Sequence, residues 1–134
     1  MSGDRLRDWL GIGRKEFYDP DRVAIMDMGF CFPGTGTSGD LPPRPECAPL
    51  WHEKLLQVMP NIALTILIGK YALERYAPEL PGSTMATQII GFRAILPNRF
   101  PLVHPSPRNR IWLRKNPWFL NDVIPELQKR VRAI

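Results

Sequence analysis

The sequence is poor in cysteine, with only Cys31 and Cys47 among its 134 residues. No apolar run approaches the roughly 18 residues that a membrane helix requires, and the first residues do not resemble a signal peptide. Internal repeats, the phosphate-binding pattern G-x-x-x-x-G-K-[ST] and the dinucleotide-binding fingerprint are also missing. These absences argue against a disulfide framework and predict a cytoplasmic protein with no membrane partner.

The composition is that of a globular protein. Hydrophobic residues make up 44% of the chain and charged residues 23%, which is enough apolar material to form a core and too much for a disordered chain. A chain of this length usually forms one domain. We therefore expect a single domain over residues 1–134, acting as a monomer.

Positive charge is concentrated in the last quarter of the chain. The net charge is +5, yet residues 99–134 carry eight basic and two acidic side chains, and the remainder is slightly acidic. Such a distribution suits a polyanionic partner. A solvated basic helix without a partner is an equally good explanation of the charge alone.

Predicted strands and helices alternate along the chain. Apolar, β-branched runs predict strands, whereas amphipathic spacing predicts helices. The expected strands are 22–30, 63–69 and 100–105, and the expected helices are 2–10, 49–59, 70–77, 84–93 and a last one from 116, kinked at Pro125. This alternation predicts an α/β fold, a three-layer α/β/α sandwich around a mostly parallel sheet.

Two unusual loops follow predicted strands. Residues 31–47 are rich in glycine, proline, serine and threonine, and residues 104–110 combine two prolines with a histidine and two arginines. In open parallel sheets, ligands bind beyond the carboxyl ends of the strands. We therefore expect both loops to lie at one sheet edge and to border one crevice.

The segment "HPSPRN", residues 104–109, resembles the second active-site motif of the uracil-DNA glycosylase superfamily. Its arginine form is most similar to the single-strand-selective monofunctional branch. The stretch of residues 2–34 and the segment "NPWF" at 116–119 are similar to sequences of the iron–sulfur branch. The resemblance covers most of the chain, and its most specific part is 104–109.

The resemblance implies a DNA repair hydrolase that flips uracil or a related damaged base out of DNA and cleaves its N-glycosidic bond. His104, held by Pro105, would stabilise the departing base, and Arg108 would fill the gap that the base leaves. Without the resemblance, His104 would be taken for a capping residue and Arg108 for a solvated side chain.

The same resemblance implies contacts to the DNA backbone around the motif. Ser106 and Asn109 would hold phosphate oxygens, and Arg110, with Arg114 and Lys115, would attract phosphates in general. Ser106 and Asn109 are equally suited to stabilising a turn, and the two roles are compatible.

Asp27 falls where iron–sulfur-branch members carry the asparagine that recognises the uracil edge. An amide donates and accepts hydrogen bonds, whereas an ionised carboxylate only accepts. Asp27 could therefore bond the uracil N3–H but would repel O4. It is either a reader of another base or a charged strand-end residue without a role.

Cys31 and Cys47 are spaced like two of the four cluster cysteines of the iron–sulfur branch. They would supply half of a 4Fe–4S site and would need a second, upstream pair. Two cysteines alone are more often small buried residues. A zinc set that adds His52 has no recognised spacing.

The family's first motif, a glycine-rich loop with the Asp or Asn that positions the attacking water, has no counterpart in this sequence. The chain resembles the C-terminal two-thirds of a family member, so we expect the first strand of the sheet to be missing. Two alternatives to an enzyme follow: a non-catalytic DNA-binding remnant, and an incomplete fragment that does not fold alone.

Overall fold

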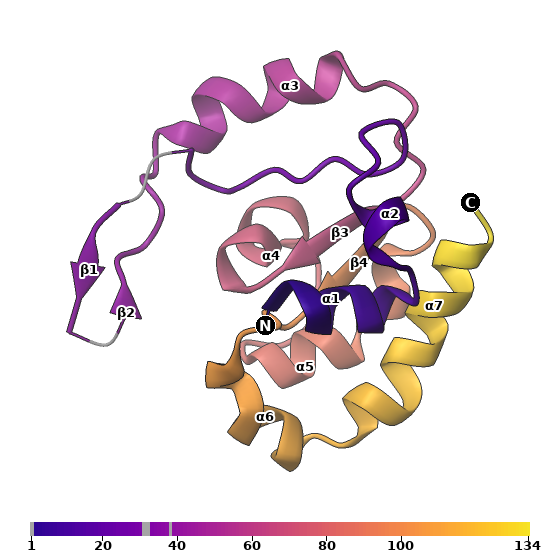
Figure 1. Cartoon of the computed structure of the whole chain (residues 1–134). Coiled ribbons are helices and arrows are strands. Elements are labelled where there is room, and N and C mark those ends of the chain that lie inside the picture. The colour runs from indigo at the N-terminus through magenta and orange to yellow at the C-terminus, as the bar shows by residue number, and fades with distance from the viewer. Residues whose placement is uncertain (1, 31–32, 38) are drawn as a thin grey trace. The chain divides into compact units, whose positions relative to one another are not determined.

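The computed structural model describes residues 2–30, 33–37 and 39–134. The chain forms two compact units (Figure 1), which we call the major unit, Met1–Val23 with Ala63–Ile134, and the minor unit, Ala24–Ile62. Each unit is described by itself. The single domain expected from chain length stays a prediction.

The major unit contains a parallel pair of strands, β3 (Thr65–Ile68) and β4 (Arg99–Leu102), in which Ile68 lies opposite Leu102. The connection between them holds α4 (Lys70–Tyr76), α5 (Met85–Ile90) and a short 3₁₀ helix, as a parallel crossover requires. Both predicted strands and both predicted helices of this stretch are confirmed.

The N-terminal helix is also as predicted. Helix α1 (Ser2–Leu10) ends at Gly11, whose positive φ of 72° is readily adopted by glycine. Its buried face carries Trp9 and Leu10. A short helix, α2 (Arg14–Phe17), follows and buries Phe17.

The C-terminal segment contains the helix that we expected from residue 116 and, before it, a short helix that we did not expect. It consists of α6 (Arg110–Lys115), a π-helical turn (Phe119–Val123) and α7 (Ile124–Arg132). Pro125 lies in the first turn of α7, where a missing N–H is tolerated. The wider π turn therefore ends before the proline and accommodates it.

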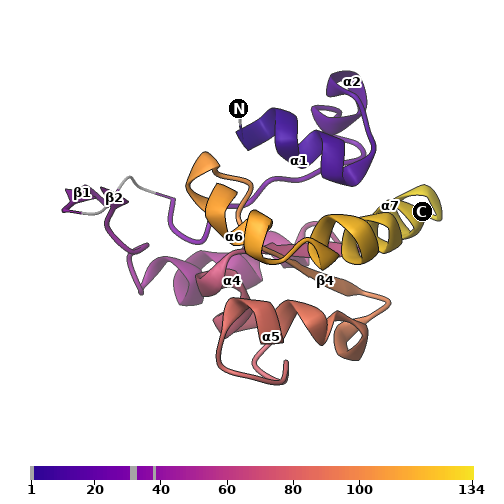
Figure 2. The ribbon, with the colours of Figure 1, turned by 90° about the horizontal axis from the view of Figure 1, so that it is seen from below.

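The core of the major unit joins its helices to the sheet. Figure 2 shows α5 on one side of β4 and α7 on the other, and the buried side chains come from all three elements. Fully buried members include Ile89, Phe100, Leu102, Phe119 and Leu127. Apolar layers on both sides of a parallel pair are those of the predicted α/β class, and a three-layer sandwich is consistent with them.

The minor unit corrects two predictions. Residues 24–30 form no strand and run as irregular chain, and the 31–47 segment includes a small antiparallel pair, β1 (Thr35–Gly36) and β2 (Gly39–Asp40). An apolar run forms a buried strand only where a neighbouring strand pairs with it and a core covers it. Neither is described for residues 24–30, where the Ile25 side chain is 66% exposed.

A helical stretch follows in the minor unit, as expected. It starts with a π-helical turn (Ala48–His52) and continues as α3 (Glu53–Gln57). Two large apolar side chains of this stretch are exposed, Trp51 at 51% and Val58 at 74%. Among the described residues of this unit, only Ala48 and His52 are buried.

Candidate functional site

The motif loop, residues 104–109, begins two residues after β4 and therefore lies at the carboxyl end of the parallel pair. Val103 and Pro105 are buried, whereas the His104 side chain between them is exposed. Proline on both sides of Ser106 restricts the backbone. The sequence thus anchors the loop in the core at two points and presents the histidine outward.

Backbone contacts fix the tautomer of His104. The Ser106 N–H donates to Nδ1 of His104 over 3.1 Å, so Nδ1 carries a lone pair and the neutral ring carries its proton on Nε2. Partial burial of the ring lowers the pKa of His104 from its ordinary value of 6.5. At neutral pH the loop therefore holds an uncharged imidazole with an Nε2–H donor.

Ser106 and Asn109 are engaged within the loop. The Ser106 hydroxyl accepts from the Arg108 N–H at 3.2 Å, and the Asn109 side-chain amide donates to the His104 carbonyl at 2.8 Å. The Asn109 N–H also donates to the Ser106 carbonyl at 3.0 Å. These bonds bear out the turn-stabilising role, and the phosphate contacts stay a prediction.

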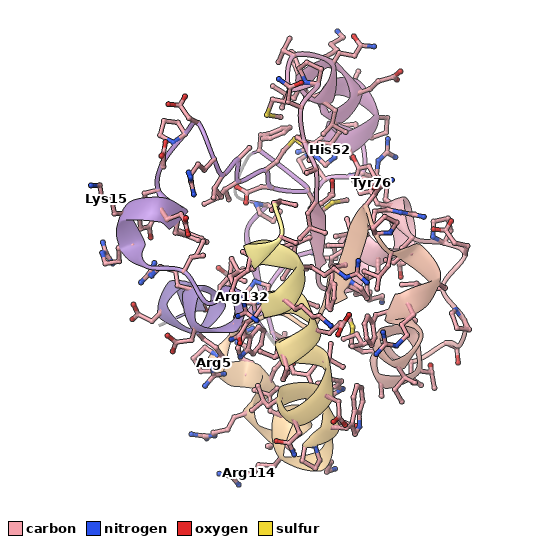
Figure 3. The ribbon with its side chains drawn as sticks, turned by 90° about the vertical axis from the view of Figure 1, so that its right-hand side faces the viewer. Arg5, Lys15, His52, Tyr76, Arg114 and Arg132 are labelled. Atoms are coloured by element: carbon pink, nitrogen blue, oxygen red, sulfur yellow. The ribbon has the colours of Figure 1, made fainter. Side chains whose placement is uncertain are left out.

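Basic residues lie in the motif loop and in the helix that directly follows it. Arg108 and Arg110 have exposed side chains, and α6, which starts at Arg110, ends in Arg114 and Lys115. Figure 3 shows Arg114 at the outer edge of the major unit, pointing away from it. The loop and α6 therefore carry four exposed basic side chains, which we call the basic surface: Arg108, Arg110, Arg114 and Lys115.

The strand beside β4 ends at the same edge, and sequence reasoning assigned no role to the residues after it. The Gly69 N–H donates to the Leu102 carbonyl at 2.9 Å, and Gly69 has a positive φ of 87°. The exposed Lys70 follows, with its ammonium 5.8 Å from the centre of the Tyr71 ring. The sequence feature that could have indicated a role for this segment is Gly69, which lies between a predicted strand and a predicted helix.

Arg5 was likewise missed. From α1, its Nη1 donates to the Ser106 carbonyl at 3.4 Å. The two residues are 101 positions apart in the chain, so no local pattern could have paired them.

Asp27 lies in the minor unit with an exposed side chain. Its carbonyl accepts a hydrogen bond from Nε2 of the buried His52 at 2.9 Å, and Phe30 packs edge-on against the same imidazole, 5.6 Å away. The segment around Asp27 is thus held by its backbone, which leaves the carboxylate open to solvent. Its role as a base reader stays a prediction.

Only Cys47 of the two predicted cluster cysteines lies in the described part of the chain. Cys31 lies outside the described residues, and Cys47 is half-buried just before the π-helical turn of the minor unit. Within the described parts of the chain, no group of three or more histidine, cysteine, aspartate or glutamate residues could hold a metal ion. The half cluster site of Cys31 and Cys47 stays a prediction.

We expected a shared crevice because both loops were predicted to follow strands, and this prediction is wrong for one of them. The 31–47 segment does not follow a strand in the structure, and it belongs to the minor unit whereas the motif loop belongs to the major unit.

None of the described helices is long and apolar enough to span a membrane.

The fold and the motif loop define an α/β protein that presents a neutral histidine and a basic surface at the carboxyl end of a parallel strand. The model of the Uracil DNA glycosylase superfamily matches residues 1–128, and the chain belongs to this superfamily. Its members are glycosylase hydrolases that act on DNA in repair. The resemblance to the superfamily is confirmed, whereas the branch likeness of the motif and the missing N-terminal third stay predictions.

Proposed function

We propose that this chain removes uracil or a related damaged base from DNA by base flipping and hydrolysis of the N-glycosidic bond. The observation that carries the proposal is the hydrogen bond from the Ser106 N–H to Nδ1 of His104. It leaves Nε2–H as the free donor of an exposed, neutral imidazole.

A neutral donor suits the chemistry of the departing base. Cleavage places positive charge on the sugar and negative charge on the base oxygen, and a fixed donor aimed at that oxygen stabilises the transition state. His104 donates through its Nε2–H while its ring is neutral. A charged imidazolium would first have to lose its water shell, and the neutral ring avoids that cost. Pro105 and the loop bonds keep the ring in place.

Arg108 enters the space that the extruded base leaves. Its side chain is exposed at the tip of a rigid turn, and a planar guanidinium stacks on neighbouring bases. Arg110, Arg114 and Lys115 continue the positive surface for the phosphates. Ser106 and Asn109 hold phosphate oxygens through donors that the loop contacts do not use, which are the Ser106 O–H and the second N–H of the Asn109 amide.

Asp27 contacts the base edge in this proposal. An exposed carboxylate accepts from the uracil N3–H but repels O4, so a base with donors at both positions would be preferred to uracil. Excision of a panel of damaged bases by the chain and by Asp27→Asn measures this preference.

DNA binding without catalysis is the second candidate. The sequence contains no glycine-rich motif with an Asp or Asn to position the attacking water, and this observation favours a binding function. The basic surface and the motif loop would serve both candidates equally.

Base release separates the two candidates. We would follow release of labelled uracil from single-stranded and double-stranded oligonucleotides under single-turnover conditions, with His104→Ala as the variant. A rate that falls about 100-fold or more in the variant supports the enzyme, since loss of one such donor has that effect.

Binding to the same oligonucleotides provides the control. His104→Ala should bind nearly as tightly as the unchanged chain, whereas Arg108→Ala should bind more weakly. No release by the unchanged chain, together with binding that depends on Arg108, would replace the enzyme by the DNA-binding alternative.

A further inference from the structure

Ser106 is the centre of the hydrogen bonds that shape the motif loop. Its N–H donates to Nδ1 of His104, its hydroxyl accepts from the Arg108 N–H, and its carbonyl accepts from the Asn109 N–H. These partners all belong to the loop itself. Only Arg5 reaches Ser106 from elsewhere in the described chain, with its Nη1 3.4 Å from the carbonyl oxygen.

The helix that carries Arg5 is firmly anchored. Trp9, one turn further along α1, is 5% exposed and packs edge-on against Phe119 with ring centres 5.1 Å apart. The Gln128 side chain of α7 donates to the Asp8 carbonyl at 3.0 Å. Arg5 therefore links the loop to a fixed part of the major unit.

The charge of Arg5 is directed at the loop. Asp4 forms an ion pair with Arg7, and the structure pairs Arg5 with no carboxylate in the described residues. A guanidinium without a carboxylate partner makes a stronger bond to a carbonyl than a neutral donor would. Because Arg5 is half-buried, solvent screens this bond only in part.

We propose that Arg5 is a positioning residue for the motif loop, whose bond to the Ser106 carbonyl fixes the backbone that orients His104. The expected effect on the rate of base release rests on the proposed function, whereas the expected effect on the His104 tautomer does not. If the tether is lost, the Ser106 N–H is less often in place for Nδ1, and the imidazole is free to change tautomer and rotate.

The variants are Arg5→Gln and Arg5→Lys, with Lys15→Gln as the matched control. Lys15→Gln also removes one positive charge, from an exposed position on α2 (Figure 3). Arg5→Lys keeps a charged donor and is expected to fold even if Arg5→Gln does not.

The first measurement is the nitrogen-15 spectrum of the imidazoles at neutral pH. The chain contains two histidines, and His52 in the minor unit is an internal reference. Arg5→Gln should shift the His104 Nδ1 and Nε2 signals toward a mixture of tautomers, and Arg5→Lys should restore them in part. The His52 signals and the Lys15→Gln spectrum should stay unchanged.

The second measurement is single-turnover base release with saturating DNA. Arg5→Gln should lower the rate constant about tenfold, the value of one charge-assisted hydrogen bond, and Arg5→Lys should recover part of the loss. A merely structural role would change thermal stability without changing the tautomer.

Unchanged His104 signals in both Arg5 variants would overturn the proposal. So would a tautomer shift of equal size in Lys15→Gln, because the effect would then be one of overall charge. If the unchanged chain releases no base, the proposed function fails, while the spectrum alone still decides the role of Arg5.

Discussion

The two units of the chain differ in how much apolar surface they bury. In the major unit, Phe100, Phe119 and Leu127 are fully enclosed by their neighbours. In the minor unit, Ile25 and Val58 are 66% and 74% exposed. Burial of apolar side chains is the main stabilising contribution to folding, so the major unit supplies the rigidity that the motif loop needs.

Charge follows the same division. The minor unit, residues 24–62, has four acidic and two basic side chains, whereas the basic surface of the motif loop and α6 belongs to the major unit. In our proposal the residues that contact the DNA backbone are thus on the well-packed unit, whereas the base reader Asp27 belongs to the minor unit. Four predictions sharpen or break this contrast.

The largest expected effect is on the core of the major unit. Phe119→Ala removes a ring that is 0% exposed and packs against Trp9 and Trp112. We expect the free energy of unfolding to fall by about 3–5 kcal/mol, the usual cost of such a truncation. Chemical denaturation followed by tryptophan fluorescence measures it, and a loss below about 1 kcal/mol would contradict a packed core.

Acid should abolish base release through His104. Burial lowers the pKa of His104 below 6.5, so the neutral donor form persists at neutral pH and is lost only as the pH falls through that lowered pKa. Below it, the single-turnover rate should drop about tenfold per pH unit. A rate that rises on acidification would mean that the cation is the active form.

Arg110→Ala should weaken DNA binding and reduce the slope of log K against log salt by about 1, because the exposed Arg110 attracts phosphates in our proposal. Lys54→Ala is the matched change in the minor unit, where Lys54 is exposed beside Trp51. It should leave the slope unchanged. Equal effects of both changes would place the DNA on both units.

The smallest effect is expected from Val58→Ala in the minor unit. This side chain is 74% exposed, so its truncation should alter the free energy of unfolding by no more than about 0.5 kcal/mol. Chemical denaturation of Val58→Ala and Phe119→Ala under the same conditions compares the two losses of unfolding free energy. A loss of about 1 kcal/mol or more would show that Val58 is covered in solution.

Local patterns predicted the major unit well. The β-branched run before Gly69 and the apolar run before His104 formed strands because each has a partner strand and a core to enter. The strand predicted at residues 22–30 is wrong, because no strand pairs with this run in the described chain. Pairing and cover are long-range properties that a window of sequence does not contain.

The part of the site that lies in one continuous segment could be predicted from the sequence. The motif "HPSPRN" located the loop, its position after a strand and its histidine. The tautomer of His104 depends on the Ser106 backbone, and the tether to Arg5 spans most of the chain. Both arise from three-dimensional packing and required the structure.

The central claim is that the motif loop presents His104 as a neutral Nε2–H donor. The nitrogen-15 spectrum of the unchanged chain at neutral pH tests it most directly. We predict an unprotonated nitrogen at Nδ1 and a protonated one at Nε2 of His104. A protonated Nδ1 at this pH, in either the other tautomer or the cation, would contradict the account.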